Sequence, residues 1–112
     1  MNPPPFMLVT TANDLAGHEI VEYLGIVRGI VVRSTGIARG IVGGLRSIGG
    51  GNIPEYVAVC EEARLHAYES MIAHATQLGA NAIIAFRYDA TEFVQGSTEV
   101  LAYGTAVKTR QR

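Results

Sequence analysis

Residues 54–78 read PEYVAVCEEARLHAYESMIAHATQL, and this stretch decides the fold. Its apolar side chains recur at the three- and four-residue spacing of a helical turn, which predicts one long helix. Asn52 is placed to cap the first turn, with Glu55 three residues later as in a capping box, and Pro54 is tolerated inside that turn. Gly79 marks the end of the helix, because glycine commonly follows the last helical residue.

The predicted helix has two apolar surfaces. With successive residues turned by about 100°, one stripe rich in small side chains is expected to face the chain's own sheet: Tyr56, Cys60, Ala63, Ala67, Met71, His74 and Leu78. A second group lies on a flank away from this stripe: Val57, Leu65, Tyr68, Ile72 and Ala75. One small sheet is not expected to cover both surfaces, so we expect the second group to contact a neighbouring subunit.

Length and composition indicate one small domain. The chain has 112 residues, of which 1–5 are expected to be an extended lead-in and 109–112 a polar tail. A net charge of -1 with 17% charged residues argues against a nucleic-acid partner, which needs clustered basic charge. The single cysteine excludes an intrachain disulfide, and no apolar run approaches the roughly 20 residues of a membrane span. Without a recognisable leader peptide, the cytoplasm is the expected compartment.

The segments on either side of the helix favour strands. Residues 6–10 and 18–33 precede the helical region and are rich in β-branched side chains. Residues 82–93 and 99–108 follow it and predict a hairpin that turns at residues 95–97. The second strand of this hairpin, residues 99–108, carries small side chains on one face, against which a helix could pack.

Glycines are expected to shape two further segments. Residues 18–33 exceed the length of an ordinary strand, so Gly25 and Gly29 are expected to bend it. Residues 34–51 are dense in glycine, yet apolar residues recur there at helical spacing, which predicts a shorter helix held by tertiary packing: Ile37, Ile41, Leu45 and Ile48. The expected fold is α+β in the order ββααββ, with a mainly antiparallel sheet covered on one side by both helices.

Several short motifs resemble those of one known family. They are Val21-Glu22-Tyr23-Leu24-Gly25, Arg46 ahead of the glycine cluster, Tyr56, Ala63-Arg64, Met71, Leu78-Gly79-Ala80-Asn81-Ala82 and Gly104-Thr105-Ala106-Val107. Their order and spacing are similar to those of the YbjQ-like family, which is labelled heavy-metal-binding. The resemblance implies a dodecin-subunit-like fold assembled as a homopentameric ring, and it implies no established activity.

A glycine cluster ahead of the long helix is a candidate anion site. Arg46, Gly50, Gly51 and Asn52 lie where the free N–H groups and the dipole of a helix N-terminus favour negative charge. The alternative is that the glycines only form a hinge between two helices. The resembled family commonly carries arginine where this chain has Asn52.

One side of the long helix carries a candidate metal site. Glu62, His66 and Glu69 follow one another at spacings of four and three residues. A metal ion is accordingly the cofactor considered, with the missing ligands supplied by another chain. The alternative is an ordinary solvated polar face.

The sequence contains no linear catalytic motif. Cys60 and His74 fall on the expected core stripe, whereas Glu22, Arg28 and Arg64 are expected to form ion pairs across subunits. The leading hypothesis is a non-enzymatic, cytoplasmic homo-oligomer, a pentamer by the resemblance, that binds a small molecule or ion. The alternatives are a heavy-metal-binding protein and an enzyme with a composite intersubunit site near Arg46 and Asn52.

Overall fold

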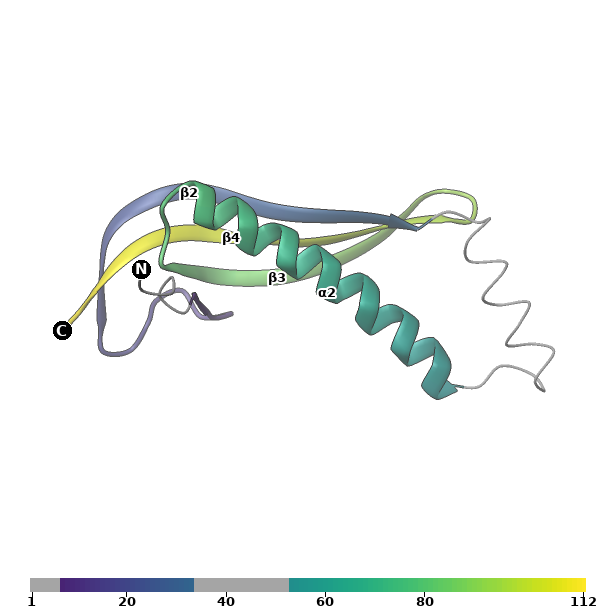
Figure 1. Cartoon of the computed structure of the whole chain (residues 1–112), viewed down its shortest axis with the longest axis horizontal. Helices are drawn as coiled ribbons and strands as arrows, with labels where there is room; N and C mark the ends of the chain where they lie inside the picture. The colour runs from purple at the N-terminus through teal and green to yellow at the C-terminus, as the bar shows by residue number, and fades with distance from the viewer. Residues whose placement is uncertain (1–6, 34–52) are drawn as a thin grey trace, which may run out of the picture.

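One long helix lies on one face of a four-stranded sheet in the computed structural model of the chain (Figure 1). Residues 7–33 and 53–112 are described, with the side chains of the helix described from Val57 onward. The elements are β1 (Leu8–Val9), β2 (His18–Arg33), α2 (Ile53–Gln77), β3 (Ala82–Val94) and β4 (Ser97–Gln111). The sheet order is β1-β3-β4-β2, in which β1 pairs with β3 in parallel and the other two pairs are antiparallel.

The α+β class expected from the sequence is confirmed, and the sheet is mixed. The predicted long strand and long helix correspond to β2 and α2 within one residue at each end. The predicted glycine-rich helix at 34–51 lies outside the described residues. Residues 109–111 of the predicted polar tail are the end of β4, which continues to Gln111, and Gln111 pairs with His18. In the described part of the chain, no helix has an apolar run that could cross a membrane.

The helix packs directly on the backbone of β2 through small residues. Gly29 is buried beneath α2, and a Cβ atom added there would overlap the carbonyl oxygen of Ala67 and lie 2.5 Å from the backbone nitrogen of Met71. Ala67 and Met71 are themselves fully buried. The expected bend at Gly29 is therefore replaced by a close helix–strand contact. Gly25 does interrupt the strand, with a φ of 109° at a shift in register.

The helix covers only part of its sheet. Its C-terminal half lies against the sheet, whereas its N-terminal half diverges from it (Figure 1). Ala63, Ala67 and Met71 are buried accordingly, but Cys60 and Leu78, expected on the same stripe, are exposed. Cys60 belongs to the N-terminal half of α2, which diverges from the sheet, and Leu78 follows the last helical residue.

The opposite face of the sheet is covered at one end. There Ala82, Ile84 and Val107 are buried, and side chains from the N-terminal segment and the start of β2 pack against them: Leu8, Leu15 and Ile20. Farther along β2, Val27 and Gly29 face the helix, so strand alternation places Ile26 and Ile30 on the opposite face. Ile26 is 70% exposed and Ile30 is 46% exposed, so this part of the sheet is bare in the single chain.

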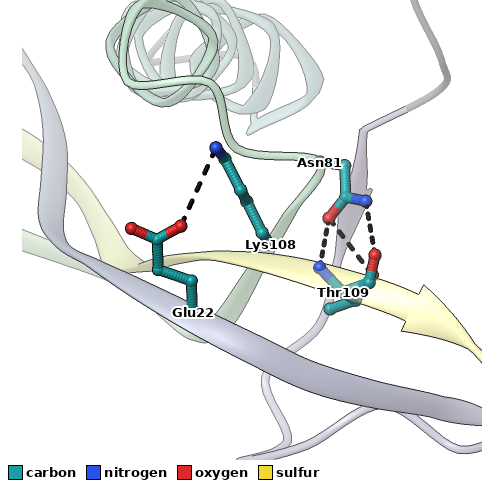
Figure 2. A network of polar contacts seen from close by, with 4 residues as sticks. All are labelled: Glu22, Asn81, Lys108 and Thr109. Carbon is teal, nitrogen blue, oxygen red and sulfur yellow. Dashed lines mark hydrogen bonds and ion pairs between the residues drawn. The ribbon is translucent and has the colours of Figure 1, made fainter.

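Asn81, in the turn between α2 and β3, is hydrogen-bonded to the end of β4 (Figure 2). Its side-chain nitrogen donates to the Thr109 carbonyl oxygen at 2.9 Å, and its side-chain oxygen accepts from the Thr109 backbone nitrogen at 2.8 Å and from the hydroxyl at 3.1 Å. Beside it, Lys108 and Glu22 form an ion pair between β4 and β2 at 3.8 Å. Glu22 therefore has a partner in its own chain rather than only across a subunit boundary.

We expect Gly29→Ala to destabilise the fold by about 3 kcal/mol, because the added methyl group forces α2 away from β2. Urea denaturation at one fixed protein concentration measures this loss. Gly17→Ala is the matched control, since Gly17 has a φ of 77° but no atom within 4 Å of the added Cβ. Its cost should be only the left-handed backbone strain of about 1–2 kcal/mol. Equal losses for the two variants would contradict the proposed contact.

Asn81→Ala should cost about 2 kcal/mol, because it removes the partners of both backbone groups of the half-buried Thr109. Thermal or urea unfolding measures the effect. Glu22→Gln, which alters the neighbouring exposed ion pair, should change stability far less. A larger effect at Glu22 than at Asn81 would show that the ion pair, not the amide, fixes this corner.

Candidate functional site

Where α2 diverges from the sheet, the two enclose a cleft of about 330 Å³. This volume is near the lower end of the range for small-molecule sites, about 300 to 1,000 Å³. The helix side of the cleft is formed by Val59, Cys60, Ala63 and Arg64. The sheet side is formed by Arg33, Tyr88, Asp89, Ala90, Thr98 and Val100.

Two arginines line the cleft from opposite sides. Arg33 is the last residue of β2, and its Nε atom is buried with no hydrogen-bond partner in the described structure. The guanidinium carbon of Arg64, on α2, lies 5.5 Å from the ring centroid of Tyr88, which is a cation–π contact. The lining of the cleft therefore includes two guanidinium groups, one on each side.

An aromatic row leads from the core to the cleft. The rings of Tyr68 and Phe86 meet edge to face with centroids 5.6 Å apart, and Phe86 meets Tyr88 in the same way at 4.7 Å. Partial burial raises the pKa of Tyr88 above its ordinary value, with the Tyr68 hydroxyl adding to the increase and Arg64 opposing it. The row holds Tyr88 rigidly against the arginine of the helix.

The residues proposed as metal ligands all lie on α2 and are not part of the cleft lining. Glu62, His66 and Glu69 are exposed on the outer side of α2. Within residues 7–33 and 53–112, no group of three His, Cys, Asp or Glu side chains converges on a point that could hold a metal ion. The metal site stays a prediction, and it needs ligands from outside these residues.

The anion-site prediction lies elsewhere in the chain. Arg46, Gly50, Gly51 and Asn52 lie outside the described residues, as does the composite enzyme site considered near two of them.

The predicted interface group is divided by the structure. Val57 and Leu65 are each 52% exposed in the single chain. Tyr68 and Ile72 are half-buried against the chain's own core, and Ala75 is fully buried in it. The assignment of Ala75 to a separate flank is therefore corrected, because the helix is rotated so that Ala75 faces its own sheet. Contact of the group with a neighbour stays a prediction.

His74 is hydrogen-bonded within its own chain. Its Nδ1 atom accepts from the backbone N–H of Arg28 at 3.3 Å, on the edge strand β2. This acceptor role places the ring proton of a neutral His74 on Nε2. The histidine thus satisfies a strand-edge amide and is not part of the cleft.

Arg33 and Tyr88 were not singled out from the sequence as site residues. A signal for Arg33 existed, because Val27, Gly29, Val31 and Arg33 share one face of β2 by alternation. A charged side chain at the end of an otherwise apolar face indicates either that it pairs with an opposite charge or that the core is open to solvent at that point. Here the face ends at the cleft.

The family assignment follows from comparison with known proteins. The YbjQ-like family model, described as "Putative heavy-metal-binding", matches residues 7–110. The chain belongs to this family. A UPF0145 protein of Legionella pneumophila (strain Corby) is 57% identical over 101 residues, which is 90% of this chain and 96% of that protein. A UPF0145 protein of Solibacter usitatus is 56% identical over 104 residues, covering 93% of each chain.

The fold also has a counterpart among solved structures. A protein of unknown function of the DUF74 family, from Pediococcus pentosaceus, has a TM-score of 0.61 and 18% sequence identity. The similarity covers 93% of this chain and 98% of that one. At this identity the match supports the fold of the YbjQ-like chain and nothing about its ligand.

We expect Tyr88 to lose its proton at a higher pH than an ordinary tyrosine, because burial disfavours the phenolate. The pKa of Tyr88 is higher in the folded chain than in the unfolded chain. The contribution of the neutral Tyr88 side chain to stability is therefore complete below the unfolded pKa. It is lost as the pH rises through the folded pKa. The difference between the tyrosinate absorbance titrations of wild type and Tyr88→Phe isolates this group.

Arg64→Met should raise the pKa of Tyr88 further, since the guanidinium lowers it. Arg112→Met removes the same charge elsewhere and should leave the titration unchanged. A Tyr88 that titrates like free tyrosine would contradict the packing described for this wall of the cleft.

Proposed function

We propose that the protein is a non-enzymatic cytoplasmic homo-oligomer, with five subunits in a ring, that binds a small ligand or ion beside α2. The observation that carries the proposal is the presence of two separate exposed apolar surfaces. One is the outer flank of α2, with Val57 and Leu65. The other is the bare sheet face along β2, with Ile26, Ile30 and Val32, which are 46–70% exposed.

The two surfaces favour a ring over a two-fold dimer. They lie on different sides of the chain, because α2 covers the sheet face opposite to Ile26 and Ile30 (Figure 1). If the flank of one subunit packs on the sheet face of the next, each subunit offers one surface and uses the other. Such head-to-tail contacts repeat until they close into a ring. The number five is taken from the family resemblance.

The position of β2 adds a second reason for assembly. It is an edge strand of 16 residues. Exposed, long and apolar edge strands tend to pair with other chains indiscriminately. Covering of the free β2 edge by another copy of the same chain would remove this hazard.

Sedimentation or native mass measurement of the wild type is expected to give a pentamer at micromolar concentration. Leu65→Glu and Ile26→Glu should each shift the protein toward smaller species, because each places a charge in the proposed contact. Gln77→Glu, on the polar side of α2, is the matched control and should leave the pentamer intact.

Mixing the two disrupted variants tests the head-to-tail arrangement. The Ile26 variant retains its helix flank and the Leu65 variant retains its sheet face, so one unaltered flank-to-face contact can form between the two variants. The mixture should give heterodimers and no ring. A monomeric wild type would end the assembly proposal, and restoration of full rings in the mixture would contradict the pairing of these two surfaces.

Metal binding is a second candidate function, favoured by the family description and by the exposed Glu62, His66 and Glu69 side by side on α2. Zinc titration of protein purified without chelator should then show stoichiometric binding that His66→Ala abolishes. His18→Ala is the control, because His18 lies on β2 away from this face. Binding should also require the assembled protein, since the described chain offers too few ligands. Absence of stoichiometric metal in the assembled wild type would remove this candidate.

A further inference from the structure

We propose that the cleft between α2 and the sheet binds a small organic anion: a carboxylate or phosphate monoester attached to an apolar or aromatic body. This inference rests on the proposed ligand-binding function and names the chemical class of the ligand. It depends on the described chain alone, because every lining residue belongs to residues 33 and 59–100.

Arg33 supplies the first reason. A guanidinium group is always charged in a protein, and its N–H groups are donors only. The Nε of Arg33 is buried and has no acceptor in the described structure. Burial of a charged donor without an acceptor is costly, and buried polar groups are normally hydrogen-bonded. Arg33 also lines the cleft, so an anion held there would balance the charge of this guanidinium group.

Arg64 supplies the second reason. Its guanidinium carbon lies 5.5 Å from the Tyr88 ring centroid. This cation–π contact is made with the ring of Tyr88, whereas carboxylates and phosphates bind the N–H groups of a guanidinium. Arg64 can therefore keep its contact with Tyr88 and bind an anion at the same time.

The remaining lining residues indicate the chemical character of the rest of the ligand. Val59, Ala63, Ala90 and Val100 are apolar, and Tyr88 presents an aromatic ring. The cleft volume of about 330 Å³ is much larger than a bare phosphate needs. An apolar body attached to the anion would fill the cleft and displace water from these side chains.

Asp89 is the one acidic residue in the lining, so its direction matters. In the β3–β4 pairing, Tyr88 lies opposite Ala102, whose side chain is buried in the core under α2. Asp89 lies opposite Leu101, and strand alternation directs its side chain to the other face of the sheet. The charge presented to the cleft is therefore positive, which excludes a metal cation as its natural ligand.

Cys60 makes the proposal measurable, because it lines the cleft and is the only cysteine of the chain. Iodoacetate and iodoacetamide alkylate it by the same step: the thiolate sulfur displaces iodide and forms a sulfur–carbon bond. The two reagents are similar in size, but only iodoacetate carries a carboxylate. Their rate ratio at Cys60, relative to the ratio for N-acetylcysteine amide, reports anion attraction inside the cleft.

We expect the iodoacetate-to-iodoacetamide ratio at Cys60 to exceed that of the free thiol by about ten-fold, since a cationic cleft concentrates anions. The double variant Arg33→Met, Arg64→Met should bring the ratio back to the free-thiol value. Arg112→Met removes a guanidinium outside the cleft and should retain the full ratio. Circular dichroism identifies any variant that has not folded, and the wild-type measurements below need no variant.

Protection of Cys60 identifies the ligand class. Phenyl phosphate, which combines an aromatic body with an anion, should slow alkylation by both reagents several-fold at millimolar concentration. Inorganic phosphate and phenol, each carrying one half of the ligand, should protect much less at the same concentration.

Three results would overturn the proposal. The first is an iodoacetate-to-iodoacetamide rate ratio at Cys60 equal to that of the free thiol. The second is a Cys60 thiol that reacts with neither reagent. The third is protection by phenol alone or by inorganic phosphate alone that equals the protection by phenyl phosphate.

Sedimentation of the same samples separates this proposal from the assembly. A monomer that keeps the anion preference would refute the ring and leave the cleft assignment standing. A ring without anion preference would refute the cleft assignment and leave the assembly standing.

Discussion

The backbone contact between Gly29 on β2 and Ala67 on α2 sets the distance between the helix and the sheet. No side chain larger than hydrogen fits at position 29, so the helix is held against the strand itself. The buried residues that follow on the helix, Met71 and Ala75, extend this contact toward the C-terminal end of α2. The tightness at this point is consistent with alanine at the buried helix positions 63, 67 and 75.

The same contact accounts for the open part of the molecule. Because α2 is fixed near its C-terminal half and is straight, its first turns leave the sheet and create the cleft (Figure 1). Cys60 is exposed for that reason, although its spacing would suit a core. One packing constraint thus produces both the candidate ligand site and an exposed helical flank.

Much of the fold could be predicted from the sequence, because it depends on local patterns. The long run of β-branched residues defined β2, and the helical spacing defined α2, each to within one residue. The close approach expected from the small residues of the helix is present at Ala67.

The candidate site could not be predicted in the same way. Helical spacing gives the direction of a side chain but not the point at which the sheet beneath it ends, so Cys60 was assigned to the core. Ala75 was assigned to the flank because the rotation of the helix depends on contacts from β2 and β4. Arg33 and Arg64 are separated by 31 positions in the chain, and only the angle between helix and sheet brings both to one cleft.

The pairing of β2 has a consequence for how the protein is made. Its ladder partner is β4, with Arg33 opposite Thr98 and His18 opposite Gln111. The ribosome therefore synthesises β2 tens of residues before β4, the strand with which it pairs. During that interval a 16-residue segment rich in valine and isoleucine has no hydrogen-bonded neighbour from β4. Nascent chains of this protein should consequently depend on chaperone protection more than its small size suggests.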